Sequence, residues 1–111
     1  MSSKEKGKLA EQKACKYLED YDFYIIETNF FAKKLGEIDI IAKKNNIYHF
    51  IEVKSALDYE TAINNITPSK LSKLKRSIEY YLQIKKLDIS YCIDVIIIVD
   101  NDIDLISNIT I

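Results

Sequence analysis

Three charged residues in two neighbouring segments have the types and spacing of a site for phosphate chemistry. Asp39 ends the run Gly36–Asp39, while Glu52 and Lys54 lie in the next apolar run with one residue between them. Carboxylate oxygens are ligands that Mg²⁺ favours, together with phosphate and water. A lysine beside them can compensate negative charge. Two carboxylates and a lysine that converge on one point therefore favour metal-assisted hydrolysis of phosphodiester bonds.

Two strands joined by a tight turn would bring these residues together. Apolar residues alternate with other types along the segments at about 35–44 and 47–55, which is typical of half-buried strands. Asn45 and Asn46 separate the two segments, and asparagine tolerates the positive φ that a two-residue hairpin turn demands. The sequence therefore predicts a β-hairpin.

The register of this hairpin predicts a crowded charged face. With the turn fixed, Asp39 faces Glu52 and Glu37 faces Lys54, and all four side chains share a face with Ile41. Like charges directly opposed across strands are destabilising, so the two acids should partly protonate or bind a cation. A solvated hairpin face with a cross-strand ion pair is the alternative, and Glu37 fits such a pair as well as a supporting role in the site.

Composition limits the setting. At 111 residues the chain can form one domain with a core but not two, so residues 1–111 are expected to form a single domain. The net charge is −1, which gives no overall basic field. Charge is nevertheless segregated: six basic residues, Lys70 and Lys73 among them, stand against one acid between Ser69 and Lys86. A locally basic surface that contacts nucleic acid is expected there.

Other sequence features favour a cytoplasmic protein without membrane contact. The two cysteines, Cys15 and Cys92, lack metal-ligand spacing and are expected as small buried residues in a reducing compartment. No apolar run approaches the ~20 residues of a membrane span. The lysine- and glutamate-rich N-terminus has no signal-peptide core.

The rest of the chain predicts helices and strands around the hairpin. Helical spacing of apolar residues predicts a helix over 4–20. Thr67-Pro68, an N-cap and a first helical position, predicts a second helix to about Lys86. Three further apolar segments are expected as strands: Phe23–Thr28, Tyr91–Val99 and Ile103–Ile111. Residues 56–66 are ambiguous between a loop and a loop that contains a short helical turn around Tyr59–Ile63. The order α-β-β-β-α-β-β predicts an α/β fold, a mixed sheet flanked by helices.

Two polar residues stand at apolar positions. Asp94 interrupts the otherwise apolar segment Tyr91–Val99, where an unpaired charge is costly. It is expected to be hydrogen-bonded for structural reasons, and the alternative is that it faces the charged site. His49 falls on the apolar face of the hairpin and is expected to be a core histidine rather than a ligand.

The chain resembles a known superfamily. An aspartate near the start of one strand and Glu-x-Lys in the next resemble the PD-(D/E)xK motif of restriction-endonuclease-like nucleases, whose αβββαβ core has the same order of elements. The chain is still more similar, over nearly its whole length, to the YraN-like uncharacterised protein family. The motifs that carry this likeness are Gly7, Glu11, Asn29 after the first strand, Gly36-Glu37-Ile38-Asp39, Glu52-Val53-Lys54, Thr67-Pro68-Ser69-Lys70 and Asp94-Val95.

The resemblance implies roles for the charged residues. Asp39 and Glu52 would ligate a divalent metal, Mg²⁺ or Mn²⁺, and Glu11 would add a third carboxylate. Lys54 would orient or activate the attacking water. Lys70 would present a cation to the phosphate at the start of a helix, whose N-terminal dipole also favours anions.

The chain departs from this family in a loop that is usually rich in arginine, where it has Phe30 and Phe31. Most of its aromatic residues are expected in the core, and stacking of a base on one of these two is the alternative. The sequence thus predicts a metal-dependent nuclease-like protein that binds, and hydrolyses, DNA or structured nucleic acid. Two alternatives remain: a non-catalytic nucleic-acid-binding module of the same fold, and a protein-interaction scaffold. A homodimer is also left open.

Overall fold

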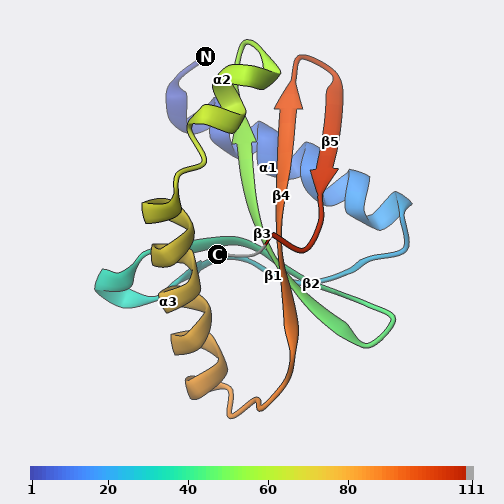
Figure 1. Cartoon of the computed structure of the whole chain (residues 1–111). Helices are drawn as coiled ribbons and strands as arrows, with labels where there is room; N and C mark the ends of the chain where they lie inside the picture. Colours follow the sequence, from blue (N-terminus) through green and yellow to red (C-terminus); the bar gives the residue numbers. More distant parts are fainter. Residues whose placement is uncertain (110–111) are drawn as a thin grey trace.

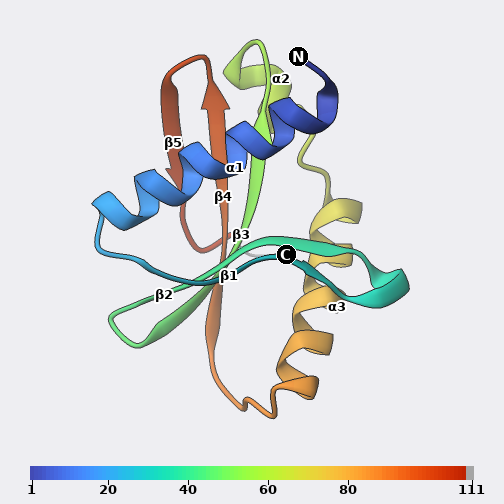
Figure 2. The same ribbon diagram turned by 180° about the vertical axis from the view of Figure 1, so that it is seen from behind.

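A mixed sheet with a helix on each face organises residues 1–109, the part of the chain that the computed structural model describes (Figures 1 and 2). Its five strands lie in the order β1-β2-β3-β4-β5. The elements are α1 Ser3–Asp20, β1 Tyr24–Phe31, the 3₁₀-helix η1 Lys33–Leu35, β2 Glu37–Lys44, β3 Ile47–Ser55, α2 Tyr59–Asn64, α3 Pro68–Ile84, β4 Tyr91–Val99 and β5 Asp102–Ile106. The predicted α/β class and order of elements are confirmed.

The hairpin forms where the sequence predicts it. Asn45 and Asn46 have φ values of 52° and 64° and make the turn between β2 and β3. The strands pair in the predicted register from Lys44 opposite Ile47 inward. Asparagine tolerates this left-handed backbone region better than most residues, so these two side chains fix the register.

The connection between β3 and β4 makes the sheet mixed. These two strands are parallel, whereas each of the other neighbouring pairs is antiparallel. A parallel pair needs a long crossover, which α2 and α3 supply. The hydroxyl of Thr67 accepts a 3.2 Å hydrogen bond from the N–H of Lys70, and Pro68 begins α3, as predicted. In the ambiguous segment, the Asp58 carboxylate caps α2 by accepting the N–H of Thr61 at 2.7 Å.

Each face of the sheet packs against one long helix. Figure 2 shows α1 lying across one face, and α3 lies on the other (Figure 1). The α1-side core contains buried residues of α1 and of three strands, together with Phe23 just before β1: Ala10, Ala14, Leu18, Phe23, Ile40, Ala42, Ile51, Ile96 and Ile98. The α3-side core contains Ile38, Ile41, Phe50, Leu74, Ile78, Tyr81 and Ile93.

Ile38 lies on the face opposite to the one predicted. It packs with Ile41 in the α3-side core, although strict alternation along β2 would place it with Ile40 on the other side. The exchange of faces occurs at Asp39, beside Asn29, which has a positive φ of 52° inside β1. Because a residue in this backbone region interrupts the regular pleat, the local direction of the side chains changes.

The hairpin ladder is also shorter than predicted. Pairing between β2 and β3 ends at Ile40 and Ile51, so Asp39 with Glu52 and Glu37 with Lys54 are not ladder partners. Beyond this point β3 follows its parallel partner β4, while β2 continues beside β1. The two strands therefore separate just where the charged residues begin.

The last strand is shorter than the predicted Ile103–Ile111. It covers Asp102–Ile106, and residues 110–111 lie outside the described residues. Both cysteines are partly buried and free, not fully buried as expected. Among residues 1–109, no helix combines the length and apolar character needed to cross a membrane.

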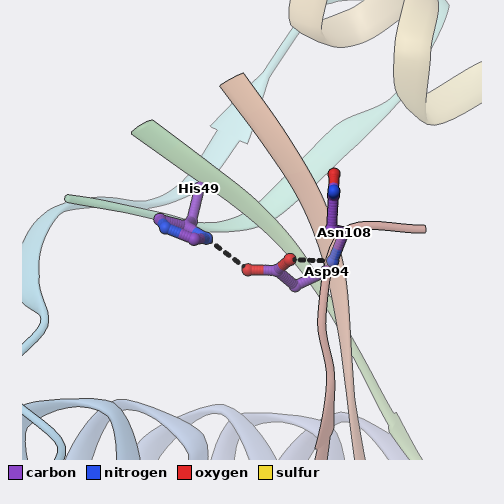
Figure 3. Close-up of polar contacts among 3 residues, drawn as sticks. All are labelled: His49, Asp94 and Asn108. Carbon is purple, nitrogen blue, oxygen red and sulfur yellow. Dashed lines mark hydrogen bonds and ion pairs between the residues drawn. The ribbon is translucent and has the colours of Figure 1, made fainter. Parts of the chain in front are cut away.

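A buried polar contact ties the segment after β5 to the sheet (Figure 3). Asp94 has no exposed surface, and its Oδ2 lies 2.6 Å from Nδ1 of His49. Its Oδ1 accepts a 2.7 Å hydrogen bond from the N–H of Asn108. The structural interpretation of Asp94 is confirmed, as is the prediction of a core histidine, whose ring packs edge-on against Phe23 at 5.0 Å.

Removing this buried carboxylate should destabilise the fold. Asp94→Ala leaves His49 and the N–H of Asn108 without their acceptor, and we expect the free energy of unfolding to fall by about 3 kcal/mol. Urea denaturation would measure the loss. Asp88→Ala, at an exposed aspartate, is the matched control and should change stability by less than about 0.5 kcal/mol. Equal effects of the two substitutions would contradict a structural role for Asp94.

Candidate metal centre

Three carboxylates from α1 and β2 meet beside the point where β2 leaves β3. Glu11, Glu37 and Asp39 each offer an oxygen, and these three atoms all lie within 4.8 Å of one another. Glu11 comes from the middle of α1, on the sheet face that this helix covers. Oxygen ligands at this spacing form an acidic group that could hold a metal ion.

Asn29 connects two of these acids and was not among the predicted site residues. Its Nδ2 donates a 2.8 Å hydrogen bond to Oε1 of Glu11 and another of 2.8 Å to Oε1 of Glu37. One amide group thus holds both carboxylates, and its donors offset part of their mutual repulsion. The sequence offered one signal: Asn29 directly follows the predicted strand Phe23–Thr28, and asparagine tolerates the positive φ that this residue adopts.

Asp39 is the most perturbed acid of the site. Burial and, after it, the charges of Glu52, Glu11 and Glu37 together raise its pKa from the ordinary 3.8 to about 8. A 2.8 Å hydrogen bond from the N–H of Val53 to its Oδ2 opposes the shift. Asp39 therefore holds a proton near neutral pH when no cation is present.

Glu52 is a second partly buried acid of the site, and lysines partly compensate its charge. Burial raises its pKa, while the charges of Lys54 and Lys70 lower it, and those of Glu37 and Glu11 raise it. It lies outside the group of three oxygens and on the lysine side of the site. Glu37, which the sequence predicted only as a possible supporting residue, supplies the third oxygen of that group in place of Glu52.

The lysines and Glu52 line two small cavities between the sheet and α3. Glu52, Lys54 and Lys70 line a pocket of about 110 Å³. A neighbouring pocket of about 170 Å³ is lined by Glu37 and Glu52 together with Lys70 and Lys73. Acidic and basic side chains thus share one groove between the sheet and α3. A larger cavity of about 490 Å³ between α1 and the ends of β3 and β4 contains none of these side chains.

Gly36 allows β2 to begin against α3. Its φ is 141°, a region that favours glycine, and a Cβ there would lie 3.1 Å from Cε of Lys73 and 3.3 Å from Oγ of Ser77. The close approach places the start of β2, and with it Glu37, beside the basic face of α3. The glycine of the Gly-Glu-Ile-Asp run therefore serves the geometry of the site.

Comparison with known proteins places the chain in a family. The family model described as Uncharacterised protein family UPF0102 matches residues 10–98, which contain every charged residue of the site. The chain is 68% identical over 108 residues to the UPF0102 protein of Aliarcobacter butzleri, covering 97% of this chain and 98% of that relative. It is 51% identical over 110 residues to the UPF0102 protein of Helicobacter hepaticus, covering 99% and 98%. The chain belongs to the UPF0102 family, which confirms the YraN-like resemblance.

Proposed function

We propose that this protein is a metal-dependent nuclease-like member of the PD-(D/E)xK superfamily that binds DNA or structured nucleic acid and hydrolyses its phosphodiester bonds. The observation that carries the proposal is the partly buried Asp39, whose pKa is raised to about 8, in an acidic group beside a groove that two lysines line. A carboxyl whose pKa is strongly raised by desolvation and by neighbouring acids, at the edge of a groove, is the kind of group that occurs at functional sites, and a bound cation would favour its charged form.

The acids would hold Mg²⁺ or Mn²⁺. Asp39 is central, because the charges of Glu52, Glu11 and Glu37 all act on its pKa, and all four offer the hard oxygen ligands that these ions prefer. When bound, the ion supplies positive charge to a phosphate and lowers the pKa of water. Asn29 keeps two of the carboxylates in place through its paired hydrogen bonds.

The lysines would serve the phosphate and the water. Lys54 lies two residues beyond Glu52 on the same strand, so both side chains point to the same face. It is placed to orient the attacking water and to stabilise negative charge on the phosphate. Lys70, in the first turn of α3, and Lys73, one turn later, would contact the nucleic-acid backbone.

A nuclease assay tests the proposal. End-labelled single-stranded, duplex and branched DNA is incubated with the protein and Mg²⁺ or Mn²⁺, and we expect cleavage that EDTA abolishes and that Asp39→Ala lacks. The absence of cleavage with every substrate and metal, or its persistence in Asp39→Ala, would contradict the enzymatic proposal. Binding without cleavage, weakening steeply with added salt, would instead support a non-catalytic nucleic-acid-binding module.

A further inference from the structure

One aromatic side chain at the rim of the acidic group has no partner in the core. Phe31 ends β1 and is 70% exposed, whereas its neighbour Phe30 packs in the α3-side core, edge-on to Tyr81 at 4.9 Å. Single exposed apolar residues are common on protein surfaces, so exposure alone assigns no role. The position of Phe31 is what distinguishes it.

Phe31 is the cross-strand partner of an acid of the candidate metal centre. Its Cα pairs with that of Glu37 in the β1–β2 ladder, and directly opposed residues have side chains about 5 Å apart on the same face. The preceding pair, Phe30 and Ile38, points into the α3-side core. Phe31 and Glu37 therefore point away from that core, where Glu37 reaches Glu11 through Asn29.

Two lysines follow Phe31 in the short loop between β1 and β2. Lys33 and Lys34 are the first two residues of η1, which is separated from Phe31 by one residue, and Nζ of Lys33 lies 6.0 Å from the centre of the Tyr80 ring. The loop is fixed by the fully buried Ala32, whose N–H donates to the carbonyl of Gly36 at 2.8 Å. An exposed ring beside two lysines matches a nucleotide, whose base presents a flat apolar face and whose phosphate is an anion.

Building on the proposed function, we propose that Phe31 is a stacking platform for an unpaired base next to the phosphodiester at the acidic group, with Lys33 and Lys34 contacting the flanking phosphates. A base inside a duplex is covered on both faces by its neighbours and is not available to the ring. The platform therefore selects nucleic acid with unpaired bases at the reacting position, such as single strands, flaps and open junctions.

Binding measurements on the whole chain test the platform. Fluorescence anisotropy gives the Kd of a labelled single-stranded oligonucleotide and of a hairpin duplex in Ca²⁺ buffer, with their integrity checked on a gel. We expect Phe31→Ala to raise the single-strand Kd about tenfold and to leave the duplex Kd within about twofold. Tyr24→Ala is the matched control, because Tyr24 is also 70% exposed and lies at the other end of β1. It should change neither value.

A spectroscopic reporter tests stacking directly. The chain contains no tryptophan, so Phe31→Trp introduces a single indole. Its fluorescence should be quenched by the single strand and little changed by the duplex, while Tyr24→Trp should respond to neither. An unchanged single-strand Kd in Phe31→Ala, an equal loss for the duplex, or no quenching in Phe31→Trp would overturn the platform.

These outcomes separate the platform from the proposed nuclease function. Cleavage that depends on Asp39, together with a Phe31→Ala protein of unchanged single-strand affinity, overturns the platform alone. Single-strand binding that depends on Phe31, in a protein that cuts no substrate, supports the platform and contradicts only the catalytic half of the proposed function. A wild type that binds no oligonucleotide overturns both.

Discussion

The Asp39→Asn protein is expected to melt well above the wild type at pH 9 in metal-free buffer, and close to it at pH 5. In the folded wild type the pKa of Asp39 is about 8, against an ordinary 3.8. The folded state thus binds more protons than the unfolded state between these values. The resulting stability is fully present below about pH 4 and is lost as the pH rises through about 8.

Asparagine removes the charge and keeps the shape. Its side-chain carbonyl can still accept the N–H of Val53, so the bond that the carboxylate makes at 2.8 Å survives. At pH 9 the variant avoids a buried negative charge among three other acids, and we expect its melting temperature to exceed that of the wild type by roughly 5–10 °C. Thermal scans from pH 5 to pH 9 would measure the difference.

Metal should raise the melting temperature of the wild type but not that of Asp39→Asn. A divalent cation that binds only the folded state stabilises it by mass action, so 10 mM Mg²⁺ should raise the melting temperature of the wild type more at pH 8.5 than at pH 6, where protons compete for Asp39. Asp39→Asn should lose this response. Glu60→Gln, at an exposed acid of α2, should keep both the metal response and the pH dependence. A less stable Asp39→Asn at pH 9, with no metal effect on the wild type, would show that this carboxylate only caps Val53.

Local signals in the sequence were sufficient for most of the fold. Asn45 and Asn46 define a turn by their own backbone preferences, and Thr67-Pro68 defines a helix start in the same way. The continuous apolar run Tyr91–Val99 is a buried strand with the predicted bounds. Each of these features depends on residues close together in the chain.

The candidate site was predicted only in outline, because its geometry depends on distant partners. Asp39 and Glu52 are not ladder partners, since β2 leaves β3 after Ile40 and continues beside β1, while β3 continues beside β4. The hairpin pattern alone does not show where its two strands separate. The role of Asn29 likewise depends on Glu11 of α1, 18 positions away. Hydrophobic periodicity cannot reveal a contact between two polar side chains at the rim of the sheet.

Lys54→Met is expected to slow cleavage by about 10²–10³-fold while leaving nucleic-acid affinity within a few-fold of the wild type. Lys54 and Glu52 point into the same pocket, and the charge of Lys54 lowers the pKa of Glu52. Under the proposed function the lysine would act on the site twice: it would stabilise charge at the phosphate and help to keep Glu52 ionised as a ligand. Methionine retains the apolar stem and removes only the charge.

The effect of Lys54 on the pKa of Glu52 can be measured separately from the loss of rate. Without the lysine, the pKa of Glu52 should rise, so the remaining activity of Lys54→Met should need a higher pH and more metal than that of the wild type. Lys75→Met, at an exposed lysine of α3, removes the same charge without touching the pocket and should alter neither profile. Rates at saturating DNA across pH 6–9 and across a metal titration would measure both. If Lys54→Met lost only affinity, with an unchanged rate and unchanged pH and metal profiles, Lys54 would be a backbone contact like Lys70 and the water would need a different partner.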